Sequence, residues 1–282
     1  MAAGQTVDLS SPPSVPLTTS AASDPALAVL LACLHRDSRL LNVDLLTALG
    51  EDWGRLLTLA AAHGVLGLIG QRLSDASLAA YVPSAVRKAL GEAARQTAAR
   101  MLRAQTQVVE LASAFGATSI PVIALKGVYL AKAVYPNLTL RAMQDIDLMV
   151  SREDLPRATE IALTLGYAPI RPFTVEQEAN AKPHIARLTR RASLDVEIHW
   201  NITAPNQIYS IDPADLWTHA VPVDFGACRT FGLSREHLLL HLCIHTSYQH
   251  GFEFGIRSLV DIAAIIRRFG EELDWSFVEH QC

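Results

Sequence analysis

Two aspartates separated by one apolar residue stand at the start of an apolar segment in the middle of the chain. They are Asp145 and Asp147, in the run Asp-Ile-Asp-Leu-Met-Val. In a β-strand, residues two apart project to the same face, so this spacing predicts two carboxylates side by side. Adjacent negative charges repel unless a positive group lies between them. Because hard divalent cations such as Mg²⁺ prefer carboxylate oxygens and also bind phosphates, the spacing indicates a metal and phosphate site.

A lysine and a glycine precede the two aspartates, at the end of the apolar run 120–125. Gly127 permits a tight turn from strand to helix and a close approach of the backbone to a phosphate. The free N–H groups at the start of the next helix can bind an anion. Lys126 is either a further phosphate ligand or a surface residue at the strand end. Arg141 can grip a phosphate with two hydrogen bonds, or it can neutralise the aspartates.

A third acid is expected on a later strand, within residues 194–200. Strict alternation there places Asp195, Glu197 and His199 on one face and apolar residues on the other. Three acids can hold the two divalent ions that clamp the attacking and leaving oxygens of a phosphoryl transfer. Alternation alone leaves both Asp195 and Glu197 open as the third acid. Glu197 could also act as a general base toward an acceptor hydroxyl.

In this order, these residues resemble the nucleotidyltransferase superfamily with a core like that of DNA polymerase β. More narrowly, they are similar to a bacterial family of uncharacterised nucleotidyltransferases. The matching steps here are Leu125-Lys-Gly127, Arg141, Asp145-Ile-Asp147 and Glu197-Ile-His-Trp200. The resemblance extends over about residues 25–282 and implies an α+β fold. In that fold, a small mixed β-sheet is flanked by N-terminal and C-terminal helical regions.

The resemblance also implies an enzyme that uses Mg²⁺ or Mn²⁺. It would move a nucleoside monophosphate from an NTP, with ATP the expected donor, onto a hydroxyl of a small molecule, peptide or protein. Pyrophosphate would be released. The resemblance assigns the metal to Asp145, Asp147 and Glu197, and the nucleotide to Lys126, Gly127, Arg141 and His199. The alternative is a protein of the same fold that binds nucleotide for regulation and has no turnover.

Four regions are expected along the chain. Residues 1–24 are rich in Ser, Thr, Pro and Ala and are predicted to be a disordered tail, whose last residue, Asp24, can cap the first helix. Residues 25–115 show apolar residues at helical spacing. Residues 116–225 alternate between strands and helices, as expected for the core. Residues 226–282 return to helical spacing, and the chain could be truncated at its end.

The composition bounds the protein's surroundings and partners. Half of the 282 residues are hydrophobic and the net charge is −4, without a run of Lys and Arg, so no nucleic-acid partner is expected. The four cysteines are scattered, and the N-terminus lacks a basic segment followed by an apolar one. These features predict reduced thiols in a cytoplasmic protein. No apolar run is long enough to predict a transmembrane span.

Two further patterns lie near the C-terminus. His237, His241 and His245 recur every four residues on a predicted helix. Such histidines can bind Zn²⁺, pack in the core or line a pocket, and the sequence leaves all three roles open. Asp261 lies inside an apolar helix, where a buried acid needs a partner. Arg257, four residues earlier, is the predicted partner in a structural ion pair.

Overall fold

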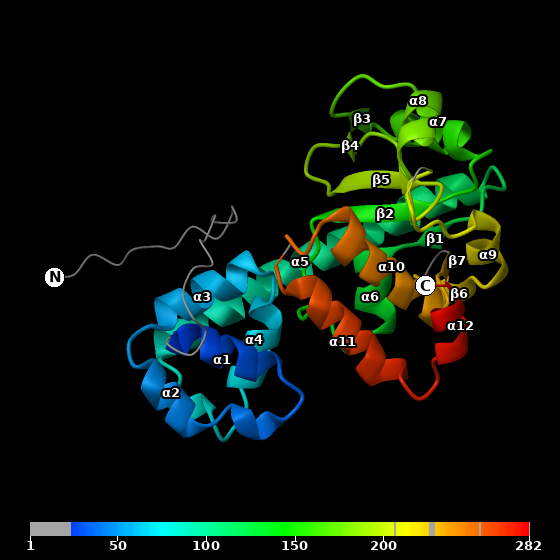
Figure 1. Ribbon diagram of the computed structural model, residues 1–282. Coiled ribbons are helices and arrows are strands. Elements are labelled where there is room, and N and C mark those ends of the chain that lie inside the picture. The colour runs from blue at the N-terminus through cyan, green and yellow to red at the C-terminus, as the bar shows by residue number, and fades with distance from the viewer. Residues whose placement is uncertain (1–23, 206, 226–228, 254, 282) are drawn as a thin grey trace.

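The computed structural model describes residues 24–205, 207–225, 229–253 and 255–281 (Figure 1). The predicted tail therefore lies outside the described residues, apart from Asp24. The N-terminal helices form a group of their own beside the sheet (Figure 1). This group consists of α1 (Pro25–Leu34), the 3-10 turn η2 (Ser38–Leu40), α2 (Val43–Leu49), α3 (Trp53–Ala62), α4 (Leu66–Leu73) and the 3-10 turn η3 (Ala79–Tyr81).

The first helix begins where the sequence predicts. The Asp24 carboxylate accepts hydrogen bonds from the backbone N–H groups of Ala26 and Leu27, at 3.1 and 3.2 Å. Pro25 occupies the first helical position, where its missing N–H costs nothing. Arg55 from α3 also forms an ion pair with Asp24 at 2.5 Å. The cap therefore joins α1 to α3 as well as starting α1.

The long helix α5 (Ser84–Gly116) connects the N-terminal helices to the sheet (Figure 1). Its first half contributes Val86 and Leu90 to the apolar core of the N-terminal helices. Its second half contributes Met101 and Phe115 to the larger core beneath the sheet. One continuous helix thus belongs to both cores.

Among the residues that the structure describes, seven short strands form one mixed sheet in the order β3-β4-β5-β2-β1-β7-β6. The strands are β1 (Ile123–Ala124), β2 (Asp145–Met149), β3 (Ala168–Pro169), β4 (Leu188–Thr189), β5 (Asp195–His199), β6 (Val221–Asp224) and β7 (Arg229–Gly232). β2 is parallel to β5 and β1 is parallel to β7, whereas the other pairs are antiparallel. The expected small mixed sheet flanked by helices is confirmed.

The remaining helices surround this sheet. They are α6 (Lys126–Ala133), α7 (Leu155–Thr164), α8 (Val175–Ala181), α9 (Pro213–Thr218), α10 (Arg235–Ile244), the π-helical turn η4 (His245–Gln249), α11 (Arg257–Phe269) and α12 (Trp275–Gln281). α7 and α8 lie at the β3 and β4 end of the sheet, and α9 and α12 lie at the β6 and β7 end (Figure 1). α10 packs against both α11 and α12.

The hairpin of β6 and β7 was not predicted. β7 lies in the region 226–282 that was expected to be helical, and it pairs with β1, with Ile123 opposite Phe231. The expected boundary after residue 225 therefore falls within the hairpin. The strand signal is weak because Pro222 cannot donate to a ladder and the side chains of β6 are mostly exposed.

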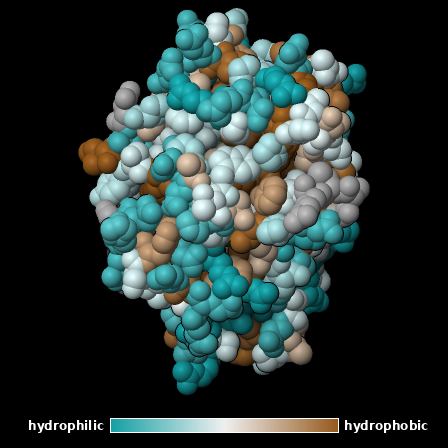
Figure 2. Space-filling model, turned by 90° about the vertical axis from the view of Figure 1, so that its right-hand side faces the viewer, coloured by the Kyte–Doolittle hydropathy of each residue, from teal (hydrophilic) through white to brown (hydrophobic). Residues whose placement is uncertain are grey.

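Polar residues cover most of the face shown in Figure 2, and hydrophobic residues occur on it in separate patches. The longest helix, α5, carries charged residues along its length, among them Arg87, Arg95 and Arg103. Among the residues that the structure describes, no helix is both long and apolar enough to cross a bilayer.

Candidate active site

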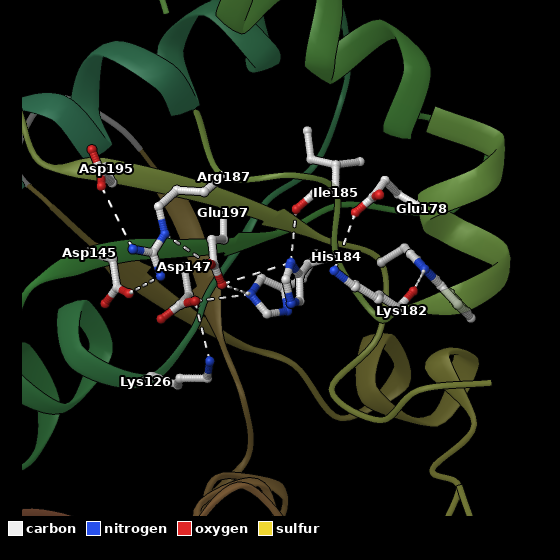
Figure 3. A network of polar contacts seen from close by, with 12 residues as sticks. Lys126, Asp145, Asp147, Glu178, Lys182, His184, Ile185, Arg187, Asp195 and Glu197 are labelled. Carbon is white, nitrogen blue, oxygen red and sulfur yellow. Dashed lines mark hydrogen bonds and ion pairs between the residues drawn. The ribbon is translucent and has the colours of Figure 1, made fainter. Parts of the chain in front are cut away.

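The pairing of β2 with β5 places the predicted acids in two rows, each made of one acid from β2 and the acid opposite it on β5. Asp147 lies opposite Glu197, and Asp145 lies opposite Asp195. The residues between the acids, Ile146, Val196 and Ile198, are fully buried in the core below the sheet. The acids therefore project from the other face, where Asp145, Asp147 and Glu197 lie close together (Figure 3).

This face opens into a cavity of about 570 Å³, which lies within the size range of small-molecule sites. The sheet side of the cavity carries the predicted acids and cations, and residues of α10, η4, α11 and the loop after β5 line much of the rest. Its polar lining includes Lys126, Asp145, Asp147, Arg187, Glu197, His199, His241, His245 and Arg257. Gly127 and Arg141 line it as well, so the structure brings every predicted site residue to one cavity.

Asp147 is the most enclosed of the acids, with 4% of its surface exposed. One carboxylate oxygen accepts a hydrogen bond from Lys126 Nζ at 3.3 Å and lies 2.9 Å from His199 Nε2. Burial opposes ionisation, but the charge of Lys126 and the hydrogen bond from His199 outweigh it and hold the pKa of Asp147 well below its ordinary range. Asp147 is therefore a carboxylate at neutral pH.

Asp145 has different surroundings. Burial raises the pKa of its carboxyl group, and the negative charges of Asp147 and Glu197 raise it further. The positive charges of Lys126 and then Arg187 oppose this rise, and Arg187 Nη2 lies 3.9 Å from Asp145 Oδ2. The repulsion expected from the spacing of the two aspartates thus falls mainly on Asp145.

Arg187 is a site residue that the sequence prediction missed. Its Nε donates to Glu197 Oε1 at 3.2 Å, and its guanidinium lies 3.9 Å from both Asp145 and Asp195 (Figure 3). The signal was available in principle, because β4 is antiparallel to β5 with Leu188 opposite the buried Val196. Because side chains alternate along a strand, Arg187, which precedes Leu188, must then point to the same face as the acids.

The turn between β1 and α6 differs from the prediction in one detail. Lys126 has φ of 41°, in the left-handed region that residues with a Cβ rarely adopt. Space favours glycine at position 127 instead: a Cβ there would lie 3.1 Å from Met143 Cβ and 3.3 Å from Arg141 Nη1, which is tighter than ordinary contact. The Lys126 side chain is only 16% exposed, so it is not a surface lysine. The turn aims its ammonium group at Asp147.

Arg141 lies at the cavity, but Asp261 uses most of its donors. Arg141 Nη2 and Nε donate to the Asp261 carboxylate at 2.8 and 3.1 Å, and Tyr135 Oη donates to it at 2.7 Å. The predicted ion pair of Asp261 with Arg257 is therefore wrong. A bidentate pair between two buried side chains from distant segments replaces the contact along one helix.

Arg257 is consequently left as a cation at the cavity wall. Its side chain forms no hydrogen bond or ion pair with the described residues. Burial, and then the positive charge of Arg141, lower the pKa of Arg257 to about 10. An arginine that is largely desolvated and unpaired gains from an anionic partner. The sequence prediction paired this residue with Asp261 and so missed its place at the cavity.

The three histidines of α10 and η4 do not share one site. His241, which is 1% exposed, and His245 line the cavity, whereas His237 lies away from it and contacts Asp215. Burial lowers the pKa of His241, and together with the charge of Lys126 it lowers the pKa of His245 to about 2. His241 and His245 are therefore neutral at physiological pH.

A divalent cation fits the side chains on the sheet side of the cavity. Donor atoms of Asp147, Glu197 and His199 all lie within 4.8 Å of one another. Asp145 lies two residues before Asp147 on the same face, outside this closest group. A set dominated by carboxylate oxygens suits Mg²⁺ or Mn²⁺. His199, predicted to bind nucleotide, thus lies among the candidate metal ligands. Its Nδ1 is buried and has no hydrogen-bond partner among the described residues.

The solved structures that are similar to this chain at low sequence identity include two that cover more than half of it. One is the solution structure of the antibiotic-resistance factor ANT(2'')-Ia, with 12% identity and a TM-score of 0.41 over 62% of this chain and 95% of that one. The other is the crystal structure of an antigenic nucleotidyltransferase-like protein from Paracoccidioides brasiliensis. It has 16% identity and a TM-score of 0.40 over 58% of this chain and 76% of that one. Among curated proteins, none matches the chain.

A sequence profile of a family described as "Uncharacterised nucleotidyltransferase" matches residues 50–282. The match includes both acidic strands, the turn at Lys126 and the helices that line the cavity. Because it spans well over half of the sequence, this chain belongs to the uncharacterised nucleotidyltransferase family.

Proposed function

We propose that this nucleotidyltransferase moves a nucleoside monophosphate from an NTP, with ATP as the expected donor, onto a hydroxyl of a small molecule, peptide or protein. Pyrophosphate is the leaving group. The observation that carries the proposal is the row of Asp147 and Glu197, with Asp145 beside it, at the wall of a cavity that also holds Lys126 and Arg257. Anionic and cationic groups face one space, as an NTP with a metal ion requires.

Asp145, Asp147 and Glu197 would hold Mg²⁺ or Mn²⁺, with His199 next to them. When bound there, the metal stabilises the charge on the transferred phosphoryl group and on the attacking and leaving oxygens. Asp147 suits this role because it stays ionised at neutral pH.

The cations of the cavity suit the phosphates. The first N–H groups of α6 belong to the turn of Lys126 and Gly127 at the cavity wall, where they can donate to an anion. Arg257 can donate to phosphate oxygens without breaking an existing ion pair. Arg141 remains a candidate phosphate ligand, although its pairing with Asp261 leaves it fewer free donors.

Glu197 is our choice for the third acid. Its side chain is 13% exposed and lies opposite Asp147, whereas the Asp195 side chain is 35% exposed and lies one row away. Glu197 can in addition accept the proton of an acceptor hydroxyl, because it lies at the cavity that the acceptor must enter.

One observation favours the alternative of a regulatory protein without turnover. Arg187 forms ion pairs with Asp145 and Glu197, so a protein side chain already neutralises acids that would bind metal. In the enzyme, Arg187 would have to move aside or share the carboxylates with the cation. In the regulatory protein, it would keep its place, and nucleotide would bind without transfer.

Thermal unfolding with each of the four NTPs, with and without Mg²⁺, tests the shared site. Ligands that bind the native state raise its stability by mass action. We expect Mg²⁺ and ATP together to raise the melting temperature by more than the sum of their separate effects. Additive shifts would count against a shared site. Pyrophosphate release on addition of a lysate of the source organism then separates the enzyme from the regulatory protein.

A further inference from the structure

A second cluster of possible metal ligands lies apart from the cavity, where α9, α10 and α12 meet. Asp215 and His219 are four residues apart on α9, and His237 belongs to the first turns of α10. One Asp215 carboxylate oxygen lies 3.0 Å from His219 Nδ1, and the other lies 3.1 Å from His237 Nε2. Ligand atoms of all three residues lie within 4.8 Å of one another.

These distances are close to those of a formed metal site. Zinc binds imidazole nitrogen and carboxylate oxygen at roughly 2.0–2.2 Å, so neighbouring ligands in a tetrahedral site lie about 3.3 Å apart. Small side-chain rotations would lengthen the contacts of Asp215 with His219 and His237 from 3.0 and 3.1 Å to about 3.3 Å. His219 Nδ1 also lies 3.0 Å from the Asp215 backbone carbonyl oxygen. If Nδ1 carries a proton in this contact, it must release that proton before it can bind a metal.

The surroundings orient the imidazole of His237. This side chain is fully buried, and burial lowers its pKa and favours the neutral form that binds metals. Its Nδ1 lies 3.2 Å from Ser234 Oγ, which leaves Nε2 to face Asp215. Such hydrogen bonds to the second ring nitrogen are usual for histidine ligands of metals.

The outer wall of the cluster is partly apolar. The Phe277 ring packs against both imidazoles, with centroids 5.2 Å from His237 and 5.6 Å from His219. Gln281 Nε2 donates to Asp215 Oδ2 at 3.4 Å. Both residues belong to α12, so this helix covers the cluster, and a metal ion there would be partly shielded from water.

We propose that Asp215, His219 and His237 bind one divalent transition-metal ion of the zinc class. Two imidazoles and one carboxylate form a set that such ions prefer over Mg²⁺. The ion would tie α9 to the start of α10, the helix that carries His241 into the cavity wall. Its role is to stabilise this part of the fold, separately from the chemistry of nucleotidyl transfer.

The test is zinc titration of the full chain after chelator treatment, without nucleotide, followed by calorimetry and thermal unfolding. We expect zinc to bind and to raise the melting temperature of the wild type. Because loss of even an outer-shell partner costs 10- to 100-fold in affinity, His219→Ala should weaken zinc binding by about 100-fold or more. His219 is 46% exposed, so its replacement should leave the core intact. His280→Ala, which removes an exposed histidine of α12, is the matched control and should bind like the wild type.

The candidate active site also contains possible zinc ligands. The variant Glu197→Gln, which removes one of them, distinguishes zinc binding there from zinc binding at Asp215, His219 and His237. The His219-dependent binding should persist in Glu197→Gln, and Asp215→Asn should weaken it as His219→Ala does. In the Glu197→Gln background, a cobalt absorption spectrum typical of nitrogen and oxygen ligands should appear, and it should be lost when His219→Ala is added. Failure of zinc to bind, binding that His219→Ala leaves unchanged, or binding lost only in Glu197→Gln would each overturn the proposal.

Discussion

Asp145 and Asp147 lie on one face of one strand, yet folding affects their charges in opposite ways. Lys126 and His199 contact Asp147 and favour its ionised form. Asp145 is buried beside the negative charges of Asp147 and Glu197, and the positive charges of Lys126 and Arg187 compensate them only in part. The ionised form of Asp147 therefore stabilises the fold, whereas that of Asp145 destabilises it. The repulsion that the spacing of the two aspartates predicts acts mainly on Asp145.

This difference predicts different stabilities for two conservative variants. Folding lowers the pKa of Asp147 below its ordinary 3.8, so its ionised form stabilises the protein above that pH, and the effect is lost as the pH falls. Asp147→Asn should lower the free energy of unfolding at pH 7 by about 1–3 kcal/mol, because Lys126 loses its partner. Asp145→Asn should leave it unchanged or raise it, because folding disfavours that charge. Metal-free denaturant unfolding measures both, and equal losses would contradict this account.

Arg257 offers a test of the phosphate assignment. Arg257→Ala should raise the KM for the NTP by about 10- to 100-fold, as expected for loss of a hydrogen bond to a charged group. The effect on kcat should be small if the contact is equally strong throughout the reaction. Arg267→Ala, at an exposed position of the same helix, is the control. Equal KM values for the wild type and Arg257→Ala would remove Arg257 from the nucleotide site.

At the scale of elements, the alternation in β5 was sufficient to predict which face carries the acids. Val196 and Ile198 are buried as predicted, because a strand with one apolar face has only one favourable register. The same reasoning could not find the partner of Arg141. Asp261 lies 120 residues away, and no local pattern records which distant side chain will meet a buried charge. The hairpin of β6 and β7 was missed because its apolar alternation is weak.

The register of β2 and β5 predicts the relative importance of the two candidate third acids. Glu197→Gln should lower kcat by about 100-fold or more while NTP binding persists, since a metal-bound acid that also positions the hydroxyl acts mainly in the transition state. Asp195→Asn should have a modest effect, because Asp195 lies opposite Asp145 and one row further from Asp147. Single-turnover rates and nucleotide affinities for both variants give the comparison. An inactive Asp195→Asn beside an active Glu197→Gln would contradict the assignment.

At the scale of the whole molecule, the N-terminal helices are joined to the sheet by α5 and by a close contact of α4. Gly67 of α4 lies against the segment before Arg141: a Cβ at this glycine would stand 1.9 Å from the carbonyl oxygen of Thr139. Backbone atoms cannot yield as a flexible side chain can. The N-terminal helices therefore support the segment that leads to Arg141 and the acidic strand.

Gly67→Ala should thus destabilise the protein by about 1–3 kcal/mol through overpacking at this contact. Gly54→Ala is the matched control, because that glycine lies in α3 with open space around its missing Cβ. The control should be neutral or stabilise the protein by up to about 1 kcal/mol. Denaturant unfolding of the two variants makes the comparison. Equal stabilities would show that α4 does not rest tightly against the core.

The central claim is transfer of the nucleotidyl group at the acids of β2 and β5. Its most direct test is incubation with Mg²⁺, a lysate of the source organism and ATP labelled on either the α- or the γ-phosphate. The account predicts that wild-type protein transfers the α-label to an acceptor and releases the γ-label in pyrophosphate, and that Asp147→Asn does neither. Transfer of the γ-label to the acceptor, or undiminished α-label transfer by Asp147→Asn, would contradict it.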